Sequence, residues 1–318
     1  MKMNYKLKKI SSDASFREFY RMQKGTKSSI IVLAKKNKFK NLIVYSTVND
    51  ILNQNGILAP KLLNHFINDS IIEITDFGKT SFYNFIKNKE KKFKFYKKLI
   101  DLIIKIQKIK FKKEYKFKKT KIKLENYDAK NLHIESDLFF DWYLKYFFNE
   151  KRNKLIKRKV KKELDKLYKK LFFKNKYFTH RDFHASNIML FKGKLGLIDN
   201  QDAIIGNPLY DVVSLIDDVR VKIPNKTKDE LFQYYLKKTK FEKTNSKNDF
   251  DILSIQRNLK ILGIFMRLHL RDKKSNYLKF LPYTWKLIEM RLKNPIFYDL
   301  KILIDRLISK AKRKRKKF

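Results

Sequence analysis

Residues 176–199 read KYFTHRDFHASNIMLFKGKLGLID, and this stretch is the most informative about the fold. Its first half is a polar loop that ends at Asn187. Its second half holds two apolar runs, 188–191 and 194–198, separated by Lys192-Gly193. Two short apolar runs around a tight Gly-containing dipeptide are typical of an antiparallel β-hairpin. The sequence therefore predicts a hairpin that directly follows a polar loop.

Four polar residues mark this stretch: His180, Asp182, Asn187 and Asp199. Because the outer ends of an antiparallel hairpin meet, Asn187 and Asp199 should lie roughly 5–8 Å apart across the ladder. Amide and carboxylate oxygens are ligands that suit Mg²⁺. The order H-x-D-x-x-x-x-N, followed by an Asp at the end of a hairpin, is that of a kinase catalytic loop. Each residue alone would more often stabilise a turn, so the phosphoryl-transfer interpretation depends on the combination.

Length and composition indicate a globular protein with a substantial core. The chain has 318 residues, of which 43% are apolar, and it has no cysteine. No apolar run approaches the roughly 18–20 residues that a membrane-spanning helix needs. The first ten residues are basic but lack the apolar centre of a signal peptide. We therefore expect a cytoplasmic protein without disulfides and without a membrane span.

The formal net charge of +45 raises the question of a nucleic-acid partner. It comes from 77 Lys and Arg against 32 Asp and Glu, and these basic residues are spread along the whole chain. With only 7 Gly and 5 Pro, the bias is typical of an AT-rich genome, so no specific nucleic-acid partner is expected. The densest basic cluster is the tail 310–318, which we expect to be a solvated end. The positive field should still attract anionic ligands such as ATP.

Periodicity divides the chain into two parts. The first 75 residues predict strands and turns with one helix, which ends near Asn55-Gly56. These strands are expected at 5–10, 16–22, 29–33, 61–66 and 70–75, and the helix at 40–53. The remainder has mostly helical spacing, interrupted by the hairpin. These helices are expected at 82–110, 136–148, 151–173, 209–219, 229–238, 249–271, 283–292 and 296–310, with a lysine-rich surface connection at 111–123.

This order predicts an α+β, two-lobed, protein-kinase-like fold. Residues 1–75 would form a small β-rich N-lobe that covers the nucleotide, and residues 76–309 a larger helical C-lobe with the catalytic loop and metal site. Residues 310–318 would form the basic tail. The letters Asp76-Phe77-Gly78 match a kinase metal-binding motif but precede the catalytic loop, whereas that motif should follow it. We instead expect the backbone of Glu73 to Asp76 to lie between the lobes and to pair with adenine.

Several stretches resemble the aminoglycoside phosphotransferase family, and within it the bacterial anomeric kinases of N-acetylmuramate and N-acetylglucosamine. They are SDASFREFY at 12–20, DLFFDWYL at 137–144, LIDNQDAIIGNPLYDVVSLIDD at 197–218 and QRNLKILGIFMRL at 256–268. The resemblance spans nearly the whole length, and the last two stretches point to the subgroup. It implies an enzyme that transfers the γ-phosphoryl group of ATP to a sugar hydroxyl in cell-wall sugar recycling.

The resemblance also implies individual roles in the catalytic loop. Asp182 would be the catalytic base, and Asn187 and Asp199 would hold Mg²⁺ that bridges the ATP phosphates. His180 would be structural. Asp211 would be a buried acid that bonds the backbone of the catalytic loop, with a plain carboxylate at a helix N-terminus as the alternative.

The nucleotide contacts of the N-lobe are less well defined by the sequence. No G-x-G-x-x-G is present, so Ser12 and Ser15 would cover the phosphates with hydroxyls and backbone amides. Lys35 or Lys36 would pair with the phosphates, with Lys35 preferred, because alternation lets only one of them face the cleft. Asn200 stands where the subgroup usually has Phe, and we expect it to loosen the packing under the site.

A polar stripe on a late helix is the candidate sugar contact. Gln256, Lys260, Gly263 and Arg267 follow helical spacing on an otherwise apolar helix. We predict that Gln256, together with neighbouring Arg257, reaches the sugar, with the solvated edge of a core helix as the alternative.

Two residues after the metal Asp, Gln201 and Asp202, are further candidates for sugar binding, with turn stabilisation as the competing explanation. Two other functions stay open. One is a kinase for another small alcohol, because the loop motif is shared. The other is a basic nucleic-acid-binding protein on an inactive kinase fold.

Overall fold

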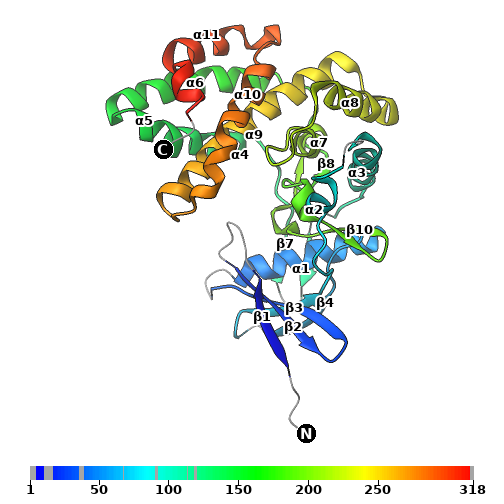
Figure 1. Ribbon diagram of the computed structural model, residues 1–318. Coiled ribbons are helices and arrows are strands. Elements are labelled where there is room, and N and C mark those ends of the chain that lie inside the picture. The colour runs from blue at the N-terminus through cyan, green and yellow to red at the C-terminus, as the bar shows by residue number, and fades with distance from the viewer. Residues whose placement is uncertain are drawn as a thin grey trace.

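The computed structural model describes residues 5–10, 17–35, 39–66, 68–89, 92–112, 114–117 and 120–315. Figure 1 shows two parts. One is an antiparallel sheet with helix α1 packed on it, and the other is larger and consists mostly of helices. The chain therefore has the two-lobed α+β architecture that the sequence predicts.

The N-lobe is a five-stranded antiparallel sheet in the order β1-β2-β3-β5-β4. Helix α1 packs its apolar side on this sheet, and Leu42 and Tyr45 of the helix join Val32 and Ile72 of the strands in one buried cluster. The predicted strands and helix are all present within a few residues of their expected bounds. The observed elements are β1 (Lys6–Ile10), β2 (Glu18–Lys24), β3 (Lys27–Leu33), α1 (Phe39–Gln54), β4 (Leu62–Phe66) and β5 (Ile71–Thr75).

The C-lobe is built around the 28-residue helix α9 (Lys243–Leu270), most of which is buried. Other helices of the lobe form most of the rest of the larger part of Figure 1. They are α2 (Phe82–Ile86), α3 (Lys92–Gln107), α4 (Ala129–Leu138), α5 (Lys145–Phe147), α6 (Glu150–Lys169), α7 (Leu209–Ile216), α8 (Asn225–Thr239), α10 (Leu281–Arg291) and α11 (Tyr298–Leu307). Among them, α4, α7 and α10 pack directly against α9. Among the described residues, no helix is both long and apolar enough to cross a membrane.

Two predicted helices differ from those observed. The helix expected at 82–110 is two helices, because α2 ends in a turn before α3 begins. The helix expected at 136–148 starts earlier, where Asp128 caps α4 by accepting a bond from the Asn131 amide, and then widens into a π-helix over Phe139–Leu144. A side chain supports this wider turn, since Asn153 Nδ2 donates to the Phe140 carbonyl at 2.9 Å.

Two further segments contain secondary structure that the sequence did not predict. The lysine-rich connection at 111–123 contains a small hairpin, β6 (Tyr115–Phe117) and β7 (Thr120–Ile122). The tail is not simply a solvated end, because Lys310–Arg313 forms helix α12. The Arg313 side chain is buried there and bonds the carbonyls of Ile304 and Ile308.

The catalytic hairpin has the predicted form. Strands β9 (Ile188–Phe191) and β10 (Lys194–Leu197) pair antiparallel, with Ile188 opposite Leu197. Lys192 and Gly193 both have positive φ, at 48° and 73°, as a tight hairpin turn requires. Two further short strands, β8 (Tyr177–Thr179) and β11 (Ile204–Gly206), pair beside the hairpin and fix the start of the catalytic loop.

Candidate active site

Asp211 anchors the catalytic loop. It is buried in the first turn of α7, and its carboxylate accepts the backbone N–H groups of His180 at 2.7 Å and Arg181 at 2.9 Å. Burial raises the pKa of Asp211, although the nearby His180 and the two backbone donors oppose this effect. Arg181 has a φ of 72°, a strained conformation that such fixed bonds can hold. This geometry is what a structural acid beneath the loop requires.

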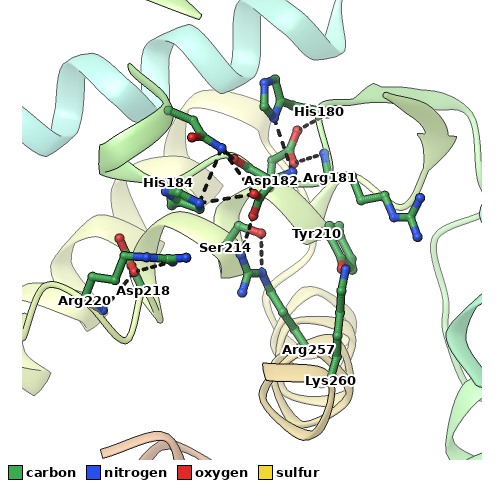
Figure 2. Close-up of polar contacts among 12 residues, drawn as sticks. His180, Arg181, Asp182, His184, Tyr210, Ser214, Asp218, Arg220, Arg257 and Lys260 are labelled. Carbon is green, nitrogen blue, oxygen red and sulfur yellow. Dashed lines mark hydrogen bonds and ion pairs between the residues drawn. The ribbon is translucent and has the colours of Figure 1, made fainter. Parts of the chain in front are cut away.

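Three side chains surround the carboxylate of Asp182, the predicted catalytic base (Figure 2). His184 Nε2 and Asn187 Nδ2 each lie 3.2 Å from Oδ2, and Arg257 Nη2 lies 3.2 Å from Oδ1. Burial favours the neutral form of Asp182, but His184 and Arg257 outweigh it and hold the pKa of this carboxyl well below its usual value. Asp182 is therefore an ionised acceptor with a fixed orientation.

Arg257 links the base to two helices. It projects from α9 toward the loop (Figure 2), and its Nε donates to Ser214 Oγ of α7 at 2.6 Å. The same guanidinium contacts Asp182, so α7 and α9 together set the rotamer of the base. The sequence singled out Arg257 as a sugar contact but gave no reason to connect it with Asp182 or Ser214.

The register of the hairpin sets Asn187 and Asp199 at its open end, each one or two residues beyond the pair Ile188 and Leu197. The Ile198 amide donates to the Asn187 carbonyl at 3.0 Å, so Asp199 is the next residue along the neighbouring strand. Asn187 donates through Nδ2 to Asp182, which turns its amide oxygen away from that carboxylate. Asp199 adopts a left-handed conformation with φ 64° and ψ 41°. A neighbouring amide oxygen and carboxylate fit Mg²⁺, which usually takes few protein ligands and completes its shell with water and phosphate.

Asn200 does not loosen the packing under the site as expected. It is fully buried, and its Nδ2 donates to Asn49 Oδ1 of α1 at 2.7 Å. Its Oδ1 lies 2.8 Å from His180 Nε2. Asn200 therefore joins α1, the catalytic loop and the segment after β10 by hydrogen bonds, and His180 takes part in them.

The residues predicted to bind nucleotide are placed unevenly. Ser12, Ser15 and Lys36 lie outside the described residues. Lys35 follows β3 and is exposed. Arg17, which was not predicted, forms an ion pair with Asp199.

The segment between the lobes begins later than expected. Glu73 lies inside β5, opposite Ile31 on one side and Asn64 on the other, so its backbone belongs to the sheet. Its side chain accepts a bond from Asn64. Asp76 leaves the sheet and pairs with Arg21 at 2.6 Å, which lowers its pKa despite partial burial. We therefore move the predicted adenine contact from Glu73 to the backbone around Asp76.

Gln201 and Asp202 follow Asp199, the predicted metal ligand, on a short 3₁₀ turn. Gln201 is mostly buried and accepts a bond from Arg17 at 2.7 Å. It also donates to Asp202 at 2.8 Å, and Asp202 is exposed. Their contact with a sugar stays a prediction.

The predicted polar stripe on α9 lies behind the catalytic loop rather than at a cleft. Gln256 has no exposed surface, and its Nε2 donates to Glu135 at 3.1 Å and to the Leu132 carbonyl at 3.3 Å. A Cβ at Gly263 would lie 2.2 Å from the carbonyl carbon of Leu138, so this glycine permits close helix packing. Direct sugar binding by Gln256 is therefore incompatible with its burial, and we revise its role to positioning.

Glu135 is the centre of that buried network. Its Oε1 accepts bonds from Lys260 at 2.7 Å and from Arg181 Nε at 2.9 Å, and its Oε2 from Tyr210 at 3.2 Å. Burial favours the neutral carboxyl, but Lys260 and Arg181 hold the pKa of Glu135 well below its usual value. The sequence did not single out Glu135, which lies just before the helix predicted at 136–148, because its partners are 46 and 125 residues away.

The sequence matches known phosphotransferases over most of its length. The model of the phosphotransferase enzyme family matches residues 6–245. An N-acetylmuramate/N-acetylglucosamine kinase of Pseudomonas aeruginosa is 28% identical over 288 residues, which are 88% of this chain and 81% of that protein. A protein of the same name from Pseudomonas putida is 24% identical and covers 95% of this chain and 88% of its own length.

Solved structures show the same fold. Spectinomycin phosphotransferase, solved with ADP and spectinomycin, aligns with a TM-score of 0.57 and 16% identity over 94% of this chain and 92% of its own. A thermostable mutant of an aminoglycoside phosphotransferase, solved in its apo form, aligns with a TM-score of 0.64 and 12% identity over 91% of this chain and 94% of its own. With this fold and a family match over residues 6–245, the chain belongs to the phosphotransferase enzyme family and is a phosphotransferase of the two-lobed protein-kinase-like fold.

Proposed function

We propose that this phosphotransferase moves the γ-phosphoryl group of ATP to the anomeric hydroxyl of an amino sugar, N-acetylmuramate or N-acetylglucosamine. The observation that carries the proposal is the grouping of the ionised Asp182 with Asn187 and Asp199 at the end of one hairpin. The names of the relatives at 24% and 28% identity support the choice of sugar. Such a product fits cell-wall sugar recycling in the cytoplasm, as the family resemblance implies.

In this mechanism Asp182 acts on the acceptor. The anomeric O–H proton passes to an Asp182 oxygen as the sugar oxygen bonds to phosphorus and the bond to the ADP oxygen breaks. Because an anomeric hydroxyl is more acidic than an ordinary alcohol, a carboxylate of low pKa is a sufficient base. Arg257 holds that carboxylate in place, which favours the near-attack geometry on which phosphoryl transfer depends.

Asn187 and Asp199 are the residues that would hold Mg²⁺. When bound, the ion would neutralise charge on the transferring phosphoryl group.

A groove beside Arg220 is the proposed entry for the sugar. It has a volume of about 680 Å³, and its charged lining residues are all cationic: Lys87, Lys92, Arg220, Lys222 and Lys279. Arg220 also contributes to the low pKa of Asp182, which places the groove within electrostatic range of the base. It forms an ion pair at 3.5 Å with the buried Asp218, on the side of the loop that carries His184 (Figure 2).

The charge of this groove also bears on other small alcohols. Lining cations repel aminoglycosides and choline, which are themselves cationic, whereas N-acetylmuramate carries a carboxylate. An amino sugar without a positive charge is therefore the acceptor that the groove favours.

The proposal is tested by measuring ADP release with a panel of acceptors. We expect turnover with N-acetylmuramate and N-acetylglucosamine, and none above background with choline or an aminoglycoside. The Asp182→Asn protein is the matched control for contaminating kinases. Turnover restricted to a cationic alcohol would contradict the proposal.

A further inference from the structure

Arg17 is a buried cation that crosses from the N-lobe to the metal-site segment. The residue lies between β1 and β2, at the entry to β2, and only 4% of its side chain is exposed. Its Nη2 donates to Asp199 Oδ1 at 2.5 Å, and its Nη1 donates to Gln201 Oε1 at 2.7 Å. The guanidinium thus lies directly against the carboxylate that would hold the metal.

Two aromatic rings hold the guanidinium in this position. Its central carbon lies 5.4 Å from the ring centre of Phe19 on β2 and 5.7 Å from that of Tyr45 on α1. Burial raises the pKa of Tyr45 to about 12, so this ring is neutral at physiological pH. Cation–π contacts of this kind favour Arg over Lys because the planar guanidinium stacks. The β2 strand and α1 therefore fix both the place and the plane of the charge.

The lysine that was predicted to pair with phosphates lies in a different environment. Lys35 is exposed and follows the last residue of β3. Moving a cation out of water is costly unless it has anionic partners, and among Arg17 and Lys35 only Arg17 is buried. The buried cation beside Asp199 therefore comes from the residue just before β2, and not from the end of β3.

We propose that Arg17 is the phosphate-binding cation of the N-lobe and takes the place that a β3 lysine has in protein kinases. The ligand class is the di- or triphosphate of a nucleotide. A guanidinium fork matches pairs of phosphate oxygens, and the bond to Asp199 fixes it beside the carboxylate that would hold the metal. The inference rests on the proposed function only in taking the ligand to be a nucleotide.

Calorimetric binding of ADP in EDTA tests this role directly, since neither metal nor sugar is present. We expect Arg17→Gln to weaken ADP binding at least tenfold and Arg17→Lys to recover part of that loss. The matched control, Lys35→Gln, should stay within twofold of the wild type. The loss caused by Arg17→Gln should persist in an Asp199→Asn background, because the contact is with the phosphates themselves.

Two results would overturn the role. Wild-type ADP affinity of Arg17→Gln in EDTA would make Arg17 only a bridge between the lobes, and a tenfold loss in Lys35→Gln would return the role to that lysine. Thermal melting of each variant checks folding. If Arg17→Gln does not fold, Arg17→Met decides, because it keeps an apolar side chain between the two rings and has no charge; wild-type ADP affinity in Arg17→Met would also overturn the role.

This result is separable from the choice of acceptor. A protein that binds ADP through Arg17 but phosphorylates no amino sugar would contradict the proposed function alone. A protein that phosphorylates the sugar while Arg17→Gln binds ADP normally would contradict the Arg17 role alone.

Discussion

At the scale of single residues, the site is organised around one ionised carboxylate. The carboxylate of Asp182 contacts Asn187 of the catalytic loop and Arg257 of α9. Arg257 in turn donates to Ser214 of α7. The spacing of the sequence was sufficient to propose Asp182 as the base, because the loop and hairpin are continuous in the chain. It could not identify Arg17 or Ser214, whose partners are brought together only by tertiary folding.

Replacing Asp182 by Asn should abolish most of the chemistry without disturbing the nucleotide site. Removal of a positioned general base typically costs about 10²–10⁴-fold in rate. We therefore expect kcat to fall by that factor while ADP affinity, measured by calorimetry, changes less than threefold. Near-normal turnover in Asp182→Asn would remove this residue from the mechanism.

Replacing Arg257 by Met should change the pH dependence of the reaction. Arg257 helps to lower the pKa of Asp182, so its removal raises that pKa. A base with a higher pKa is protonated at a higher pH, so the acid limb of kcat/KM should move upward. The measurement is a pH profile of both proteins from the lowest pH at which they stay folded up to pH 8, and an acid limb at the same pH in both proteins would show that Arg257 does not act on Asp182.

At the scale of elements, the position of the loop depends on how α9 packs against its neighbours. Turn chemistry and periodicity predicted the hairpin and nearly all of the helices, because these signals are local. The π-helical segment after α4 was not predicted, since it depends on Gly263 and Asn153 from distant helices. The same long-range contacts explain why Gln256 was assigned to a cleft but lies in the core.

Gly263→Ala tests the close contact between α9 and α4. The added methyl would lie within 2.3 Å of both the carbonyl carbon and the oxygen of Leu138, so one helix has to shift. Overpacking of this kind usually costs about 1–3 kcal/mol in the free energy of unfolding. Denaturant unfolding measures it, and a variant as stable as the wild type would show that the helices are not in contact at this point.

The Glu135 network predicts how stability depends on pH. The pKa of Glu135 is lower in the folded protein than in the unfolded chain. The stability that the Glu135 carboxylate contributes is therefore fully present above its unfolded pKa of about 4.3, and it is lost as the pH falls toward its folded pKa. Glu135→Gln removes the buried partner of Lys260 and Arg181 and should cost about 3–5 kcal/mol at pH 7. The difference in the free energy of unfolding between Glu135→Gln and the wild type should become smaller as the pH falls from 6 to 3.

The matched control for Glu135 is Glu150→Gln on the exposed surface of α6. It should leave the unfolding free energy nearly unchanged across the same pH range. If both variants show the same pH dependence, the buried network does not account for the acid sensitivity.

At the scale of the whole molecule, a small part of the large positive charge lines the groove that we propose as the entry for the acceptor. The amino-acid composition accounts for most of the +45 charge without reference to function. It does not predict where on the surface the cations lie close together. In the structure, the charged residues that line the groove near Asp182 are all cationic. The sequence therefore predicted the two lobes and the catalytic loop, whereas the character of the acceptor groove needed the fold.

This arrangement predicts a preference for the anionic sugar. N-acetylmuramate should have a higher kcat/KM than N-acetylglucosamine, and Lys92→Gln should lower that ratio by about two- to fivefold, as expected for one surface charge pair. Lys94→Gln, on the same helix but not in the groove lining, is the matched control. An unchanged ratio in Lys92→Gln would show that the groove does not bind the carboxylate.

The central claim is that this active site phosphorylates an amino sugar at its anomeric position. Phosphorus NMR of the products formed from ATP and N-acetylmuramate or N-acetylglucosamine tests it most directly, because a glycosyl phosphate couples to the anomeric proton and hydrolyses readily in acid. We predict such a signal together with ADP, and its absence with the Asp182→Asn protein. A stable phosphate ester at another position, or ADP without any sugar phosphate, would contradict the claim.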